Sequence, residues 1–201
     1  MSSPGNWIAV CLFALLSLDA PSLRAQTAPT PLVQRAIDKD TGIVTLTWRG
    51  GADYSPARVK AYGGVDVLAS NFEITADTVT GLLPSTTKKG EPPFSEIDAD
   101  ADLGAGHQVT GWFTQYDLGR KYKVTADHAV YSPIADAAAG GPTGTAVFTG
   151  HVTLTTFAPE ALAEPSVLKT DKLKIVLGPS HSQEYPQIES APGQMTFTPL
   201  E

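Results

Sequence analysis

Apolar and polar residues alternate in short runs along the chain beyond residue 41. In residues 95–103, SEIDADADL, apolar residues alternate with aspartate from Ile97 to Leu103. A period of two over such short lengths is typical of β-strands, and no apolar pattern with the 3.6-residue period of a normal-length helix occurs. The alternation predicts strands at 42–48, 57–69, 72–79, 95–103, 107–116, 120–131, 145–157, 167–177 and 193–199.

The segments between these runs carry turn-forming residues. Residues 82–93 and 132–144 are rich in glycine and proline, and residues 178–192 form a long polar connection. Residues 158–165, APEALAEP, predict a helical turn. The 201-residue chain contains 18 glycines and 16 prolines, a composition that favours short strands and turns. The sequence therefore predicts a single all-β domain over residues 41–201.

One strand pattern occurs three times in the chain. The sequence Thr-Ala-Asp ends at Asp77 and again at Asp127, and an imperfect copy, Lys-Thr-Asp, ends at Asp171. In each copy the apolar positions change parity by one residue at the aspartate. A strand keeps its parity unless a residue is inserted, so each aspartate is predicted to mark a β-bulge or a corner between two sheets. The carboxylate is expected to accept hydrogen bonds from local backbone N–H groups.

A second unit, in which glycine lies between two apolar residues at spacings of two, precedes each aspartate. It reads AYGGV at 61–65, VTGWF at 109–113 and FTGHV at 148–152. Alignment of the three units places Trp112 at a position that should face outward. An exposed tryptophan near Tyr116 suits the binding of a glycan or a partner protein, and the alternative is that it covers an adjacent loop.

The polar residues match no known catalytic or metal-binding motif. Asp127 and His128 are adjacent on a strand and therefore point to opposite faces, which argues against an acid–base pair. Residues 98–102, DADAD, lack the glycine and glutamate of an EF-hand loop, and they predict a solvated carboxylate face with no more than adventitious cation binding. The other histidines lack zinc-ligand spacing, and a net charge of −7 without a basic patch argues against nucleic-acid binding. We predict no catalytic residue, no metal site and no cofactor.

The first 25 residues have the character of an export signal. Residues 7–18, WIAVCLFALLSL, form an apolar run that is too short to span a bilayer and suits a signal peptide cleaved after Ala25. An uncleaved anchor or a buried segment is the alternative. Cleavage would remove Cys11, the one cysteine of the chain, and with it any disulfide or cysteine-based site. Residues 26–40 then predict a flexible leader.

Three stretches together resemble the OstA-like repeat: GGVDVLASNFEITADTVTG at 63–81, YKVTADHAVY at 122–131, and FTGHVTLTT with LKTDKLKIV within 148–176. This repeat is the unit of the LptA family of periplasmic lipopolysaccharide-transport proteins. The resemblance implies a periplasmic, open antiparallel β-jellyroll built from repeated strand pairs. It also implies an apolar trough for acyl chains, and open ends that add edge to edge to further copies or to OstA-like domains of other envelope proteins. The long loops and low repeat count leave open a bridge protein, a partner of the membrane-anchored LptC type, or a divergent relative.

The resemblance leads us to predict a non-enzymatic protein that binds or transports lipopolysaccharide or a related lipid. Removal of an acyl chain from water is favourable by about 0.8 kcal/mol per methylene. The residues expected to line the trough are Val65, Val67, Phe72, Ile74, Phe113, Val124, Phe148, Val152, Leu154, Leu173 and Ile175. The alternative is that the same residues pack on one another in a closed core, as in an exported β-sandwich that binds protein or carbohydrate. A hydrolase is disfavoured because no catalytic set is visible.

Overall fold

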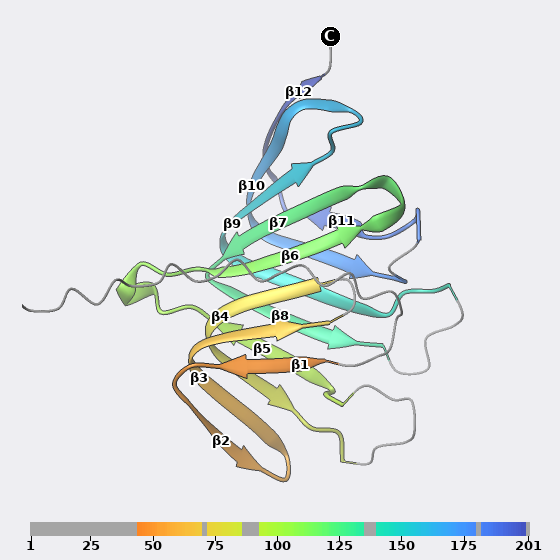
Figure 1. The fold of residues 1–201 in the computed structure, drawn as a ribbon. Coiled ribbons are helices and arrows are strands. Elements are labelled where there is room, and N and C mark those ends of the chain that lie inside the picture. The colour runs from red at the N-terminus through yellow and green to blue at the C-terminus, as the bar shows by residue number, and fades with distance from the viewer. Residues whose placement is uncertain (1–43, 70–71, 86–92, 135–139, 180–181, 200–201) are drawn as a thin grey trace, which may run out of the picture. The chain divides into compact units, whose positions relative to one another are not determined.

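The computed structural model describes residues 44–69, 72–85, 93–134, 140–179 and 182–199. Twelve strands in one sheet, all paired antiparallel, and two short 3₁₀ helices form its regular structure (Figure 1). The elements are β1 (Thr45–Trp48), β2 (Gly51–Ser55), β3 (Arg58–Leu68), β4 (Phe72–Leu82), β5 (Glu96–Asp100), η1 (Leu103–Ala105), β6 (Val109–Gln115), η2 (Tyr116–Leu118), β7 (Arg120–Ala126), β8 (His128–Pro133), β9 (Gly144–Phe157), β10 (Leu162–Leu177), β11 (Gln187–Ser190) and β12 (Gly193–Pro199). The prediction of an all-β, antiparallel jellyroll-like fold is confirmed.

The four long strands each divide their length between two shorter neighbours. Residues 72–75 of β4 pair with β6, whereas residues 78–82 pair with β5. Strand β3 pairs with β2 and then with β1, and β9 pairs with β8 and then with β7. Strand β10 pairs with β12 and then with β11. Each division is a point at which the chain passes from one layer of the sheet to the other.

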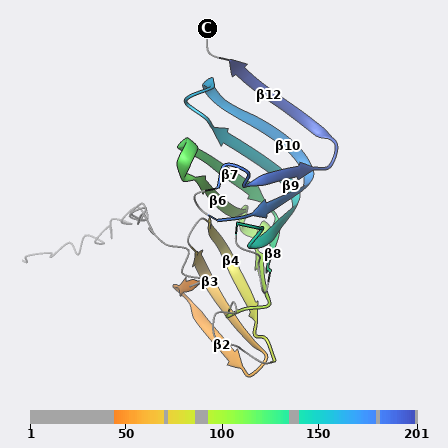
Figure 2. The same cartoon turned by 90° about the vertical axis from the view of Figure 1, so that its right-hand side faces the viewer.

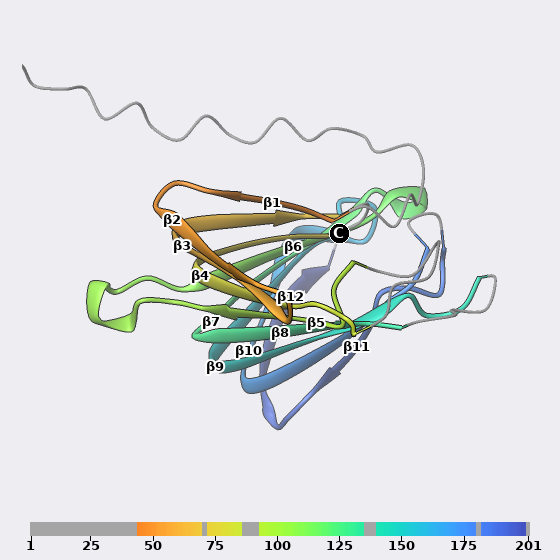
Figure 3. The ribbon, with the colours of Figure 1, turned by 90° about the horizontal axis from the view of Figure 1, so that it is seen from below.

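The divided strands create two layers that face each other. The first layer contains, in order, β1, the second half of β3, the first half of β4, β6, β7, the second half of β9, the first half of β10, and β12. The second contains β2, the first half of β3, the second half of β4, β5, β8, the first half of β9, the second half of β10, and β11. Figure 2 shows the bend in β9 and β10, and in Figure 3 the layers diverge from the side where the strands bend.

The three repeated aspartates lie at these bends. Around each one, the buried position before the bend and the buried position after it are three residues apart instead of two. These flanking residues are Ala76 and Val79 at Asp77, Ala126 and Ala129 at Asp127, and Thr170 and Leu173 at Asp171. The predicted change of parity is therefore confirmed in all three copies, and it keeps the apolar side chains pointing inward in both layers.

Glycines occupy the bends opposite these aspartates. The pairing of β3 with β4 passes from Tyr62↔Thr78 to Val65↔Ala76, so Gly63 and Gly64 lie opposite the single Asp77. Both glycines have positive φ angles, 82° and 87°, which residues with a side chain rarely adopt. The two glycines thus form a β-bulge that helps the strand to turn.

The alignment of one glycine unit was wrong. Gly111 lies within β6, where it pairs with Val124 of β7, and β6 continues to Gln115 without a register shift. At this level of the stack the bend is made by residues 101–108, which connect β5 to β6 and contain η1. Gly111 therefore has another role, which is to make room for an aromatic ring in the core.

Several strand boundaries also differ from the prediction. The helical turn predicted over residues 158–165 is shorter than expected. The chain turns at residues 158–161, and residues 162–165 already belong to β10. The predicted strand 120–131 is divided at Asp127 into β7 and β8. Strands β2 and β11 were not predicted; β11 lies inside the segment that had been interpreted as a polar connection.

The predicted signal peptide at 1–25 and the leader at 26–40 lie outside the described residues. Within the described part of the chain, no helix has the length and hydropathy that crossing a membrane requires.

Candidate functional site

The eleven residues predicted to line a lipid trough lie in one apolar core between the two layers. The first layer supplies Val65, Val67, Phe72, Ile74, Phe113, Val124, Val152 and Leu154, and the second supplies Phe148, Leu173 and Ile175. No side chain in this set is more than 4% exposed. The structure therefore brings all the predicted residues together, and in this state they pack against one another.

The predicted trough list left out most of the second layer's contribution to the core. The additional buried residues of this layer are Ala61, Val79, Ile97, Ala99, Ala129, Tyr131, Ala146 and Leu177. Four of these eight are alanines, so the strands that carry them have a weakly apolar appearance. The change of parity at each aspartate does place Val79, Ala129, Tyr131 and Leu177 on the inward side after the bend, and the structure confirms this.

Aromatic rings from the two layers meet in the middle of the core. The ring centroids of Phe72 in the first layer and Tyr131 in the second are 4.5 Å apart. Phe113 of β6 and Phe148 of β9 contact each other edge to face, with centroids 5.8 Å apart. Aromatic pairs of this kind contribute about 0.5–1.5 kcal/mol beyond the burial of their area. Burial raises the pKa of Tyr131 to about 12, so its phenol stays neutral in an interior filled by apolar groups.

Polar contacts hold a connecting segment against the far end of the first layer. Gln115, at the end of β6, is only 4% exposed. Its Nε2 donates a hydrogen bond to the backbone oxygen of Gln183 at 3.1 Å, and its Oε1 accepts one from the hydroxyl of Tyr122 at 3.2 Å. Because a buried amide is costly without partners, these bonds fix the segment that connects β10 to β11.

The two layers end at β1 and β2 on one side and at β11 and β12 on the other, and at each end an apolar residue that faces the interior is in contact with solvent. Trp48 of β1 pairs with the fully buried Val65 and so projects to the same side, yet it is 44% exposed. At the other end, Met195 of β12 pairs with Leu168, which packs on the core, and Met195 is 55% exposed. Among the described strands, β1, β2, β11 and β12 each have a paired neighbour on one side only. In the part of the chain that the structure describes, the apolar row of the interior thus continues to two ends that no further strand covers.

Asp127 and His128 do not interact as a pair, as the strand geometry predicts. Oδ2 of Asp127 lies 2.7 Å from Nδ1 of His151, whereas Nδ1 of His128 lies 2.9 Å from Oδ1 of Asp100. The backbone N–H of Asp127 donates to the carbonyl oxygen of Gly150 at 3.0 Å. These contacts give Asp127 a role in holding the bend between β7 and β8 against the bend within β9 at Gly150 and His151.

Asp77 holds the bend formed by residues 101–108. Its Oδ2 accepts a hydrogen bond from the backbone N–H of Asp102 at 2.7 Å, and its Oδ1 lies 2.8 Å from Nδ1 of His107. Burial acts to raise the pKa of Asp77, but these two hydrogen bonds outweigh it and the pKa is lowered. Asp77 thus accepts a backbone N–H as expected, but the expectation that the donor is local was wrong here, because Asp102 lies 25 residues along the chain.

Trp112 lies on the outer face of the first layer and is half-buried there. Its ring stacks with that of Phe157, with centroids 6.1 Å apart and an interplanar angle of 24°. Nζ of Lys123 lies 5.5 Å from the ring centroid, within the range of a cation–π contact. The tryptophan thus faces outward as expected, but side chains of its own layer cover part of it.

No model of a known protein family matches the chain, and a comparison with curated protein sequences finds no match either. Inference about function therefore rests on the repeated residues, the two-layer fold and the unsealed interior.

Proposed function

We propose that the protein is a non-enzymatic component of the cell envelope that binds the acyl chains of lipopolysaccharide or a related lipid between its two β layers. The observation that carries this proposal is the continuous apolar interior, which reaches solvent at Trp48 on one end and at Met195 on the other. The repeated bends at the three aspartates support the resemblance to the LptA family. Export through the apolar segment at 7–18, with cleavage after Ala25, is part of the proposal.

The free energy available for such binding is large. An acyl chain of about twelve carbons would gain about 10 kcal/mol from leaving water, at about 0.8 kcal/mol per methylene. Part of this gain must offset the separation of core side chains that now contact one another, because Phe72 and Tyr131 meet across the layers. Binding is therefore most favourable where the interior is not yet filled.

The C-terminal end of the stack meets this requirement. Two inward-facing pairs lie there: Met195 of β12 is opposite Leu168 of β10, and Ile188 of β11 is opposite Ile175 of β10. Of these four residues only Ile175 is fully buried. We therefore place the first contact with an acyl chain between β12 and β11. The free edges of these strands also suit the addition of a β-strand from an OstA-like domain or a second copy.

Site-specific photo-crosslinking tests the proposal. A photoreactive amino acid is placed at Met195, which faces inward, or at Gln194, which is its outward-facing neighbour on the same strand and serves as the matched control. The full chain is then irradiated with lipopolysaccharide. We expect a lipid adduct from position 195 and at least tenfold less from position 194.

Equal adducts from the two positions, or no adduct from a protein with an intact β circular-dichroism spectrum, would refute lipid binding in the interior. A third crosslinker at Phe148 measures how far the lipid penetrates. An adduct there shows that the acyl chain reaches the centre, whereas an adduct at 195 alone restricts the binding site to the end of the stack.

A second candidate function is an exported β-sandwich that binds protein or carbohydrate and has no lipid trough. The observation that favours it is the filled centre, where Phe113 contacts Phe148 across the layers. This candidate predicts that none of the interior positions reacts with lipid, so the same crosslinking experiment separates the two functions.

A further inference from the structure

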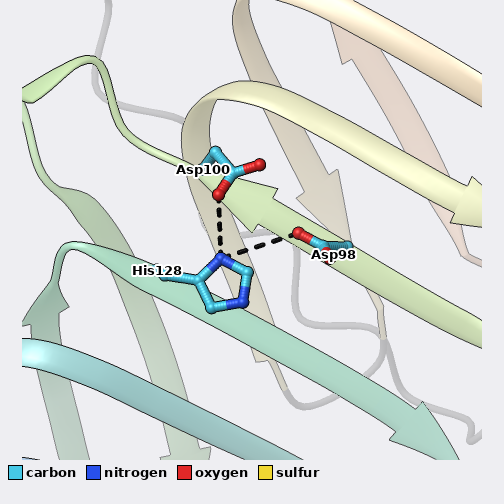
Figure 4. A group of neighbouring side chains, drawn as sticks. All are labelled: Asp98, Asp100 and His128. Carbon is cyan, nitrogen blue, oxygen red and sulfur yellow. Dashed lines mark hydrogen bonds and ion pairs between the residues drawn. The ribbon is translucent and has the colours of Figure 1, made fainter.

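Three side chains on the outer face of the second layer have the arrangement of metal ligands (Figure 4). Asp98 and Asp100 are two residues apart on β5 and therefore share one face of the sheet. His128 of β8 pairs directly with Asp100 and projects to the same side. One ligand atom from each residue lies within 4.8 Å of the other two. The cluster is separate from the apolar interior, because Ile97 and Ala99 of the same strand point inward.

The distances in this cluster suit a shared ion. Nδ1 of His128 is 2.9 Å from Oδ1 of Asp100 and 3.6 Å from Oδ1 of Asp98. Two ligands that each bond a transition metal at about 2.1 Å are about 3.0 Å apart at an octahedral angle and about 3.4 Å apart at a tetrahedral angle. The imidazole nitrogen is therefore at or near ligand spacing from both carboxylates, and side-chain rotations within the 4.8 Å span of the three atoms would bring them around an ion.

An independent observation concerns Asp98. Its Oδ1 is buried and has no hydrogen-bond partner, although the rest of the carboxylate contacts solvent. Burial raises the pKa of this carboxyl, His128 opposes that effect, and the negative charge of Asp100 adds to it. A buried polar atom without a partner is unfavourable, and a bound cation would supply the missing partner.

The neighbours of the cluster do not provide another cation. The residues that pair with Asp98 and Asp100 across the strands are Thr78 and Thr80 on β4, and Val130 and His128 on β8. None of these is a lysine or an arginine, so among the strand-paired neighbours only the imidazole faces the two carboxylates. His128 hydrogen-bonds Asp100 and lies 3.6 Å from Oδ1 of Asp98, which is ion-pair distance but too long for a hydrogen bond, so that oxygen has no hydrogen-bond partner.

We propose that Asp98, Asp100 and His128 bind a divalent transition metal of the zinc class, which links β5 to β8. One imidazole nitrogen with two carboxylate oxygens is a ligand set that suits zinc, whereas calcium and magnesium prefer oxygen ligands alone. The side chain of Asp100 is 60% exposed, so the remaining coordination positions face solvent and take up water. This metal site does not depend on lipid binding in the interior.

The chain contains its own control for this proposal. His151 pairs with Asp127 at 2.7 Å, and this pair belongs to none of the groups of three metal ligands found among the described residues. Among the described residues, His151 thus has the carboxylate of Asp127 at ion-pair distance and feels Asp171 only at longer range, whereas His128 has two carboxylates at ion-pair distance, those of Asp98 and Asp100. Zinc binding that requires His128 but not His151 would therefore identify the cluster of Asp98, Asp100 and His128 as the site.

The experiment measures zinc binding to the full chain, prepared without a polyhistidine tag and stripped with a chelator. Isothermal titration calorimetry with Zn²⁺ is carried out on the wild type and on Asp98→Asn, His128→Gln and His151→Gln. We expect one zinc ion per chain. The affinity should fall at least about tenfold in Asp98→Asn and His128→Gln, because the loss of a direct ligand costs at least as much as the loss of an outer-shell partner. It should be unchanged in His151→Gln.

A second measurement does not depend on the folding of a variant. In the ¹⁵N NMR spectrum of the wild-type histidines, Zn²⁺ should shift the side-chain resonances of His128 and leave those of His151 unchanged. The proposal is overturned by the absence of stoichiometric zinc binding, by equal loss of affinity in His151→Gln, or by calcium binding of equal strength. An unshifted His128 resonance at saturating zinc also overturns it.

Discussion

Gly150 and Asp127 approach each other so closely at the bend that no side chain fits at position 150. A Cβ atom added to Gly150 would lie 2.8 Å from Cγ of Asp127, which is closer than real Cβ contacts come. The φ angle of Gly150 is 75°, a value that favours glycine. The glycine unit and the aspartate unit, which the sequence presents as separate motifs, are here two halves of one bend.

Substitution of this glycine should therefore be costly. We expect Gly150→Ala to lower the free energy of unfolding by about 2–4 kcal/mol, because it combines an unfavourable backbone conformation with displacement of Asp127. Gly119→Ala is the matched control, since Gly119 also has a positive φ, 63°, but no atom lies within 4 Å of an added Cβ. That variant should lose only about 1–2 kcal/mol. Urea denaturation measures both, and equal losses would show that the bend adapts to a side chain.

The carboxylate of Asp77 should hold the connection between β5 and β6. We expect Asp77→Ala to lower the free energy of unfolding by about 1–2 kcal/mol, because Asp102 and His107 both lose their hydrogen-bond partner. The loss is moderate because the carboxylate of Asp77 is partly exposed to solvent. Hydrogen exchange at the amide of Asp102 should accelerate more than exchange at amides of the core strands. Asp53→Ala, on the exposed edge strand β2, should change stability by no more than about 0.5 kcal/mol. Unchanged exchange at Asp102 would contradict this role.

The bends could be predicted because their signal is local. Within β4 the apolar positions Ile74 and Ala76 are followed by Val79, and this change of parity can be read from a few consecutive residues. The alternation on both sides of Asp77 fixes which side chains face inward without knowledge of the neighbouring strands. The all-β class and most of the first layer's core follow from the same local pattern.

The pairing between distant strands could not be predicted in this way. His128 meets Asp98 and Asp100 only because β8 pairs with β5, and that register depends on the 27 residues between Asp100 and His128. The bend at 101–108 interrupts the repeat, so Gly111, which the sequence aligns with Gly63 and Gly150, lies within a strand and not in a bend. A Cβ at Gly111 would lie 2.8 Å from Cζ of Phe148, which means that this glycine makes room for a ring from the opposite layer.

The pair formed by His151 and Asp127 should make stability depend on pH. The hydrogen bond that the imidazole of His151 donates to Asp127, and the negative charges of Asp127 and Asp171, raise the pKa of His151. A histidine with a raised folded-state pKa contributes stability that is fully present below its unfolded value of about 6.5 and is lost as pH rises through the folded value. The difference in unfolding free energy between the wild type and His151→Asn should therefore be larger at about pH 5.5 than at about pH 8.5.

The choice of asparagine separates charge from backbone conformation. His151 has a φ of 46°, and asparagine tolerates this region better than most residues. Because the same variant is compared at both pH values, a backbone effect cancels in the comparison. A difference that is equal at the two pH values, measured by chemical denaturation, would show that the imidazolium contributes nothing to the bend.

Phe148 is the residue at which the closed core and the lipid trough give opposite expectations. Its ring is fully buried between the layers and contacts Phe113, so Phe148→Ala should cost about 3–5 kcal/mol, and Phe148→Leu should cost less because it removes fewer buried atoms. The leucine variant should remain folded and leave more space in the centre. If acyl chains pass through the centre, this variant should increase the yield of lipid adducts from a crosslinker at Met195, because less packing must be separated. A yield that stays at the wild-type level, with the loss of stability as expected, would restrict any lipid to the end of the stack and identify the centre as a permanently packed core.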